Sequence, residues 1–158
     1  MGVRRRRTAA ARRSRRLSRL LLHIVARGRI GRSPESDLVD RYLKRIAWPT
    51  RVTELGDRAP VPPAPDGSVT IALDERGTAL SSADLASRLE SWRDGGKREV
   101  RFLIGAAAGH GETDRGSADL LWSLGPATWP HLLVRAMLAE QLFRATSILA
   151  NHPYHREG

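Results

Sequence analysis

Short apolar runs alternate with amphipathic segments along the chain, and this alternation restricts the fold more than any other feature of the sequence. Continuous apolar runs are typical of strands buried on both faces of a sheet, and they occur at 20–26, 69–73, 100–104 and 120–124. Residues 51–55 alternate in polarity and predict a further short strand. Helical patterns separate most of these strands. The sequence therefore predicts an α/β fold with a mostly parallel sheet and helices on both faces.

The predicted helices begin and end at recognisable residues. Ser33-Pro34-Glu35 places a hydroxyl N-cap before a proline at the first helical position and an acid in the first turn. This helix is expected to end before Trp48-Pro49, because a residue that precedes proline disfavours helical backbone. Further helices are expected from Ser81 or Ser82 to Trp92, around 114–118 and over 132–150.

The positive charge is concentrated at one end of the chain. The formal net charge is +10, but residues 1–19 contain nine arginines and no acidic residue, and residues 20–158 carry a net charge of only +1. Residues 1–19 are expected to be a disordered basic extension or the product of an upstream start codon, with an organellar targeting segment and an RNA-binding arm as alternatives. Residues 20–158 have the length and apolar content of a single domain.

Composition excludes several kinds of site. The chain has no cysteine, which excludes disulfides, thiolate nucleophiles and zinc sites that need sulfur. No apolar run approaches the ~20 residues that span a bilayer, so no membrane association is expected. The histidines lack the H-E-x-x-H spacing of zinc enzymes, and no metal site is expected.

Candidate ligand-binding loops follow three of the predicted strands. Parallel sheets bind ligands at the carboxyl ends of their strands, and those ends carry Leu73-Asp74, the glycine-rich loop 105–111 and the loop 124–131. Glycines let backbone amides approach a ligand, although 105–111 is neither a Walker A motif nor a dinucleotide fingerprint. The uncharged backbone of 124–131 suits an adenine edge. Ordinary strand-to-helix connections are the alternative explanation for both loops.

The end of the chain is rich in groups that bind nucleotides. Tyr154, His155 and Arg156 place an aromatic ring, an imidazole and a guanidinium side by side, which suits base stacking and phosphate binding. A plain exposed tail is the alternative. His131, at the start of the long helix, is either a helix-terminal hydrogen-bonding residue or a site residue.

A longer pattern in the C-terminal part of the chain is more specific. It consists of Trp122-Ser123-Leu124, Thr128-Trp129-Pro130-His131-Leu132-Leu133-Val134-Arg135, Leu138-Ala139-Glu140-Gln141-Leu142-Phe143-Arg144-Ala145 and Asn151-His152-Pro153-Tyr154-His155-Arg156. This pattern resembles the signature of the ribosomal RNA large subunit methyltransferase H (RlmH) family, in the SPOUT (α/β-knot) superfamily. Leu73-Asp74 and Phe102-Leu103-Ile104-Gly105 agree with it in order and spacing, so the resemblance covers 20–158.

The resemblance implies a fold and a function. Members of the family use S-adenosyl-L-methionine to methylate N3 of a pseudouridine in 23S ribosomal RNA on the assembled ribosome, which implies a cytoplasmic enzyme. They are homodimers, and the cofactor sits in a C-terminal trefoil knot. Ordinary rules of chain topology argue against knots, so this expectation depends on the resemblance alone.

The resemblance also implies roles for single residues. By match to the family motif, the cofactor contacts are Leu73, Gly105, Leu124, Gly125, Pro126, Ala127, Thr128 and Trp129. The candidate catalytic residues are His131, Arg144, Tyr154, His155 and Arg156. N3 of pseudouridine must lose a proton for methyl transfer, and His131, His155 or water is the candidate base. The arginines are candidates for stabilising the uridine anion or holding phosphate, and Tyr154 for stacking on the base.

The chain departs from the family pattern in three places. Gly105-Ala106 replaces Gly-Gly, Gly125-Pro126-Ala127-Thr128 replaces a Ser-x-x-Thr-type loop, and proline-rich residues 56–67 replace a helix between the second and third strands. Two other functions stay open. One is a nucleotide-dependent α/β enzyme that holds phosphate at 105–111, and the other is a non-catalytic RNA-binding protein that acts through residues 1–19.

Overall fold

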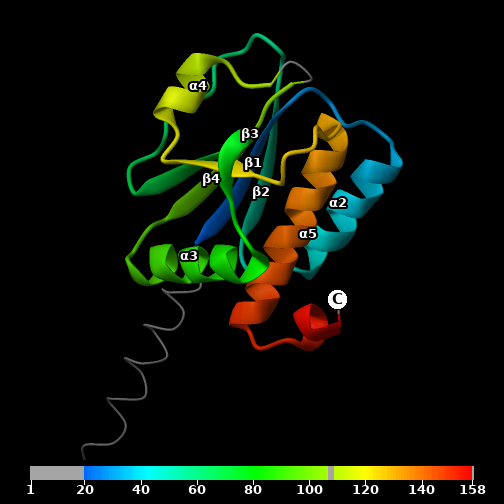
Figure 1. The fold of residues 1–158 in the computed structure, drawn as a ribbon, viewed down its shortest axis with the longest axis vertical. Helices are drawn as coiled ribbons and strands as arrows, with labels where there is room; N and C mark the ends of the chain where they lie inside the picture. The colour runs from blue at the N-terminus through cyan, green and yellow to red at the C-terminus, as the bar shows by residue number, and fades with distance from the viewer. Residues whose placement is uncertain (1–19, 107–108, 158) are drawn as a thin grey trace, which may run out of the picture.

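The computed structural model describes residues 20–106 and 109–157, and in these it confirms the α/β fold (Figure 1). All neighbouring strands of the five-stranded sheet are parallel, in the order β2-β1-β4-β3-β5. The strands are β1 (Leu21–Arg27), β2 (Thr50–Leu55), β3 (Ser68–Ala79), β4 (Glu99–Ile104) and β5 (Leu120–Ser123). The helices are α2 (Pro34–Arg45), α3 (Ser82–Asp94), α4 (Glu112–Ser117) and α5 (His131–Leu149), followed by the 3-10 helix η1 (Pro153–Glu157). The expected extension at 1–19 lies outside the described residues.

The main apolar core lies between one face of the sheet and helices α2, α3 and α5. Its fully buried side chains include Phe102 and Trp122 from the sheet and Leu85 and Leu138 from the helices. The opposite face carries a smaller apolar cluster of Val25, Ala72 and Leu103, against which Val61 and Ala118 pack. Figure 1 shows α4 on the other side of the sheet from α2 and α5. Helices therefore lie on both faces, as the sequence predicts.

The helix starts follow from their capping residues. The Ser33 hydroxyl oxygen accepts a hydrogen bond of 3.1 Å from the Ser36 amide at the start of α2. Ser81, rather than Ser82, caps α3, because its hydroxyl accepts from the Asp84 amide while the Asp84 carboxylate accepts from the Ser81 amide. Such reciprocal bonds satisfy amide groups that the first helical turn leaves unpaired.

The proline-rich segment 56–67 has no helix or strand, as expected, and two arginines of the sheet hold it in place. Arg27 donates a hydrogen bond of 2.6 Å to the Ala59 carbonyl, and Arg101 donates one of 2.6 Å to the Pro62 carbonyl. Arg101 is itself buried, and its guanidinium needs such partners, which are the Pro62 carbonyl and the Thr70 hydroxyl.

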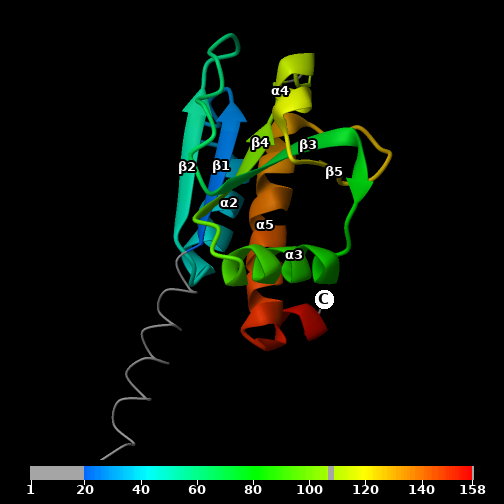
Figure 2. The same cartoon turned by 90° about the vertical axis from the view of Figure 1, so that its left-hand side faces the viewer.

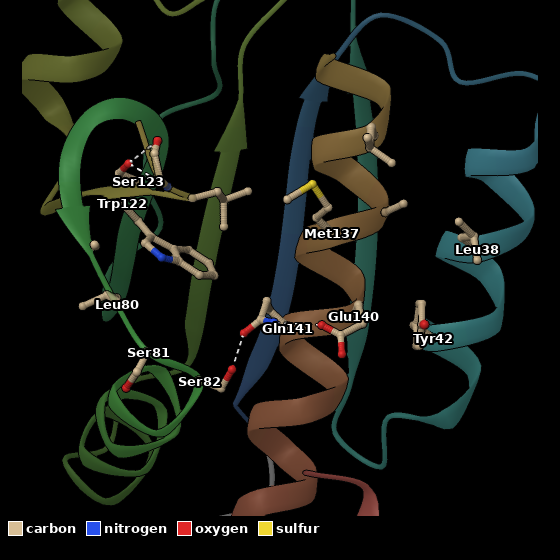
Figure 3. A pocket seen from close by; sticks show the side chains of 15 residues that line it. Leu38, Tyr42, Leu80, Ser81, Ser82, Trp122, Ser123, Met137, Glu140 and Gln141 are labelled. Carbon is tan, nitrogen blue, oxygen red and sulfur yellow. Dashed lines mark hydrogen bonds between the residues drawn. The ribbon is translucent and has the colours of Figure 1, made fainter. Parts of the chain in front are cut away.

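The predicted end of β3 at Asp74 is wrong. The strand continues to Ala79, and its pairing with β5 shifts so that both Leu73 and Thr78 face Trp122. Residues 74–77 loop around β5 in Figure 3, and a Cβ at Gly77 would lie 2.5 Å from the Leu121 carbonyl carbon. Only glycine fits this close approach. The crossing is consistent with the trefoil knot implied by the resemblance.

Candidate active site

A cavity of about 610 Å³ opens at the carboxyl edge of the sheet, beside residues 73–76 of β3 and the ends of β4 and β5. Seven of the eight implied cofactor contacts line this cavity: Leu73, Gly105, Leu124, Gly125, Ala127, Thr128 and Trp129. Pro126 belongs to the same loop but is not a lining residue, whereas the candidate base His131 is one. The topology thus brings together residues from three loops that are far apart in the sequence.

The wall formed by the β4 loop depends on Gly105. Gly109 donates a backbone hydrogen bond of 2.7 Å to the Ala106 carbonyl, and this bond folds the loop back on itself. A Cβ at Gly105 would lie 2.7 Å from the Gly109 carbonyl carbon, closer than side chains tolerate. Ala106 stands where the family pattern has a second glycine, and it still forms this bridge with Gly109.

The opposite wall is an uncharged loop of fixed shape. The Ser123 hydroxyl accepts from the Gly125 amide at 3.1 Å and donates to the Gly125 carbonyl at 3.0 Å. Gly125 has a φ of 107°, a conformation that side chains disfavour. The Thr128 hydroxyl donates to Glu75 at 3.4 Å, which ties the loop to the turn after Asp74. Residues 124–130 therefore present polar backbone groups without a charged side chain.

Charged and titratable side chains gather on the side formed by β3 and α4. Asp74 accepts from Arg115 Nε at 2.5 Å and from the Arg76 amide at 2.9 Å. Burial alone would raise the pKa of Asp74, but these two hydrogen bonds outweigh it and hold the pKa below its usual value. Burial lowers the pKa of His110 below its ordinary value. The sequence interpretation did not assign Asp74, His110 or Arg115 to the site.

The remaining candidate catalytic residues form a second group, at the other end of α5. Tyr154 donates a hydrogen bond of 3.2 Å to Glu140, and its ring centroid lies 4.6 Å from that of Phe143. Burial, followed by the neighbouring Tyr42 and Glu140, raises the pKa of Tyr154 to about 12. Arg144 donates hydrogen bonds to Glu140, at 2.8 Å, and to His155, at 3.2 Å. Arg156 instead bonds the carbonyl and side chain of Asn151.

The two groups cannot meet within one chain. His131 and Arg144 lie on the same helix, and a rise of 1.5 Å per residue separates them by ~20 Å along its axis. Figure 2 shows α5 running the length of the molecule, with the C-terminal end at the far side from α4. The cofactor residues and His131 are therefore together, and Arg144, Tyr154, His155 and Arg156 are together elsewhere.

A second cavity, of about 560 Å³, lies beside the first, between α2, α5 and the turn into α3 (Figure 3). Its lining is largely apolar and includes Leu38, Leu80, Trp122, Leu133 and Met137. Trp122, Leu124 and Gly125 line both cavities, so the two adjoin at the end of β5. We call this second cavity the α2/α5 groove.

Within residues 20–106 and 109–157, no group of three or more histidine, aspartate or glutamate side chains is placed to hold a metal ion. In the same part of the chain, none of the helices combines the length and the apolar character needed to cross a bilayer.

Comparison with known proteins agrees with the geometry. The family model described as "Predicted SPOUT methyltransferase" matches residues 20–155. The ribosomal RNA large subunit methyltransferase H of Rhizorhabdus wittichii is 67% identical over 140 residues, which cover 88% of this chain and 100% of the relative. The proteins of that name from Novosphingobium aromaticivorans and Zymomonas mobilis are 64% identical over 141 residues and 59% identical over 140 residues. These matches cover 88% and 87% of this chain, and 100% and 99% of the relatives.

Matches of this length and identity confirm the resemblance that the C-terminal residues carry. The parallel sheet, the loop of β3 around β5 and the cavity at the carboxyl edge agree with that assignment. The chain belongs to the SPOUT methyltransferases and, within them, to the ribosomal RNA large subunit methyltransferase H family.

Proposed function

We propose that this protein transfers a methyl group from S-adenosyl-L-methionine to N3 of a pseudouridine in 23S ribosomal RNA, on the assembled large subunit in the cytoplasm. One observation carries the proposal. In a chain 67% identical to a ribosomal RNA large subunit methyltransferase H, seven of the eight implied cofactor residues converge on one cavity at the carboxyl edge of the sheet.

The cavity has properties that suit this cofactor. Its volume of about 610 Å³ is within the usual range for small-molecule sites. The absence of a side chain at Gly105 keeps the β4 loop closed, and the neutral loop 124–129 offers backbone groups to an adenine edge. When bound there, the cofactor supplies an electrophilic methyl group on a sulfonium.

The protein's own residues have to remove the N3 proton and exclude water. Trp122, Leu124 and Val134 supply an apolar lining, which excludes competing water. The Arg144 guanidinium donates a hydrogen bond to Nδ1 of His155. In a neutral His155 the ring proton is then on Nε2, so that nitrogen can donate a hydrogen bond but cannot accept the N3 proton. His131, which lines the cavity, is therefore our candidate base.

The split between the two groups of residues supports a homodimer. A second copy whose α5 runs in the opposite direction would bring its Arg144, Tyr154, His155 and Arg156 to the cavity of the first. The apolar α2/α5 groove lies beside that cavity and is a fitting surface for the second copy. Each active site would then combine the cofactor residues of one protomer with the tail of its partner.

The decisive experiment is methyl transfer from labelled cofactor to ribosomes that lack the modification, followed by mass-spectrometric mapping of the labelled nucleoside. We expect one N3-methylated pseudouridine in 23S RNA. Label in another nucleoside, or none in ribosomal RNA, would contradict the proposal.

Two measurements address the other functions. Calorimetry should detect binding of S-adenosylhomocysteine and no binding of NAD or GTP. Binding of a nucleotide at 105–111 would favour the nucleotide-dependent enzyme. A chain that begins at Leu20 should retain turnover at saturating ribosome, because the nine arginines of 1–19 supply only salt-sensitive attraction to RNA. Loss of all RNA-dependent activity in this truncation would favour a binding protein that acts through the extension.

A further inference from the structure

The cavity at the carboxyl edge has two chemically different sides. The 124–130 side has only uncharged side chains. The side formed by β3, α4 and the loop before α4 has five charged or titratable residues, Asp74, Glu75, Arg76, His110 and Arg115. A ligand that fills the cavity would therefore meet neutral backbone groups with one part and charged groups with another.

His110 has a hydrogen-bonding atom with no partner on this charged side. The residue is only 7% exposed, and its Nε2 has no partner at hydrogen-bond geometry among the described residues, although backbone groups of Leu73 and Leu103 lie close enough to the ring to raise its pKa against the effect of burial. A buried polar atom without a partner is costly and is rare in folded proteins. His110 also lines the cavity, so a ligand that binds there lies next to this imidazole.

Arg115 is held beside His110 with donors to spare. Its Nε donates to Asp74, whose side chain is only 3% exposed, and the second oxygen of Asp74 accepts from the Arg76 amide. Asp74 thereby fixes the position of the guanidinium. A guanidinium has five N–H donors, and the structure gives Arg115 one hydrogen bond among the described residues.

We propose that His110 and Arg115 bind the amino-acid end of S-adenosyl-L-methionine, with Asp74 as a positioning residue. The inference rests on the proposed function and extends it to residues outside the implied cofactor set. The amino-acid end carries a carboxylate and an ammonium, so it complements a guanidinium with free donors, an unpaired imidazole nitrogen and a nearby carboxylate. The uncharged adenine complements the 124–130 side.

The test compares two ligands that differ in this end. S-adenosylhomocysteine has the amino acid, whereas methylthioadenosine keeps the adenine, ribose and sulfur and lacks it. Calorimetry on the full-length protein gives the affinity ratio of the two ligands for each variant. Arg115→Gln should weaken the binding of S-adenosylhomocysteine by about tenfold or more, and His110→Leu should weaken it by about three- to tenfold. The affinity for methylthioadenosine should change by less than about twofold in both variants.

Arg58→Gln is the matched control, because Arg58 is an exposed arginine of the proline-rich segment and does not line the cavity. The ratio of the affinities for S-adenosylhomocysteine and methylthioadenosine should be the same in Arg58→Gln as in the unaltered protein. Equal losses for both ligands, or no loss for either, would overturn the inference. If Arg115→Gln does not fold, the ratio for His110→Leu decides. If the unaltered protein does not bind S-adenosylhomocysteine, the proposed function itself fails, which is a distinguishable result.

Discussion

A side chain at position 105 would collide with the loop that closes the cavity. The nearest atom to a Cβ there is the Gly109 carbonyl carbon, at 2.7 Å, and backbone cannot move aside as a flexible side chain can. We therefore expect Gly105→Val to open or distort this wall. The cost should be at least about 1–3 kcal/mol, which calorimetry would detect as roughly tenfold or weaker binding of S-adenosylhomocysteine.

A second glycine in the same region is the control for this substitution. Gly111 has open space around its Cβ position and a φ of −70°, which any residue adopts. Gly111→Ala should therefore bind S-adenosylhomocysteine as the unaltered protein does. Unchanged affinity in Gly105→Val, or an equal loss in both variants, would show that this wall does not hold the cofactor.

At the scale of elements, one ion pair connects β2 to α5. Glu54 accepts from Arg135, whose side chain is only 1% exposed, and also from the Ile30 amide. The Arg135 hydrogen bond is the main cause that lowers the pKa of Glu54 below its ordinary value of 4.5. Because Arg135 is buried, removing Glu54 leaves a charge without its counter-charge.

Glu54→Ala should lower the free energy of unfolding by about 1–3 kcal/mol at neutral pH, measured by urea denaturation at fixed protein concentration. A carboxyl with a depressed folded pKa stabilises the protein above its unfolded pKa, and this contribution disappears as the pH falls through the folded pKa. The difference between the two proteins should therefore shrink below pH 4.5. Glu90→Ala, at an exposed glutamate of α3, should change stability by less than about 0.5 kcal/mol.

Most elements could be predicted from the sequence because buried parallel strands are continuous apolar runs and because α2 and α3 have capping serines. The end of β3 could not. Residues 74–78 are Asp-Glu-Arg-Gly-Thr, which is typical of a turn, and only their pairing with β5 extends the strand to Ala79. That pairing is a tertiary contact, so no local pattern indicates it. Gly77 was the available signal, since glycine in a strand often marks a close backbone approach.

The C-terminal tail lies apart from the cofactor residues of its own chain, so substitutions in the tail should affect methyl transfer and not cofactor binding. Tyr154 and Arg156 do not line the cavity of their own chain. Tyr154→Ala or Arg156→Ala should therefore reduce methyl transfer to ribosomes by about tenfold or more while S-adenosylhomocysteine binds almost as before. Tyr154→Phe, which keeps the ring against Phe143, should retain more activity than Tyr154→Ala. Loss of cofactor affinity in these variants would contradict the separation.

At the scale of the whole molecule, the sequence indicates which residues belong to the site but not how far apart they lie. His131 and Arg144 are on one predicted helix, and the length of that helix separates the two groups by ~20 Å. His110 lies within the glycine-rich loop 105–111, but it gave no distinguishing signal, because a histidine in such a loop has many ordinary roles. Its unpaired nitrogen and its place in the cavity emerge only when β3, β4 and α4 are packed together.

If each active site combines residues of two protomers, two variants with impaired activity should restore activity to each other. Gly105→Val damages the cofactor side and Arg156→Ala damages the tail side. In a mixed dimer, one site receives both substitutions and the other receives neither. Random exchange in an equal mixture makes half of the dimers mixed, so about a quarter of the original sites should work.

The mixture is prepared by unfolding and refolding the two variants together, and methyl transfer is measured against each variant refolded alone. Gly105→Val mixed with His131→Ala is the control, because both residues line the same cavity. Each site of this mixed dimer has one of the two substitutions, so no activity should return. Recovery in this control would mean that His131 acts in the partner's cavity. Recovery in the first mixture alone supports a shared site. No recovery there, while a protein refolded without substitutions regains full activity, would mean that each chain completes its own site and that the tail must reach the cavity by another arrangement of the chain.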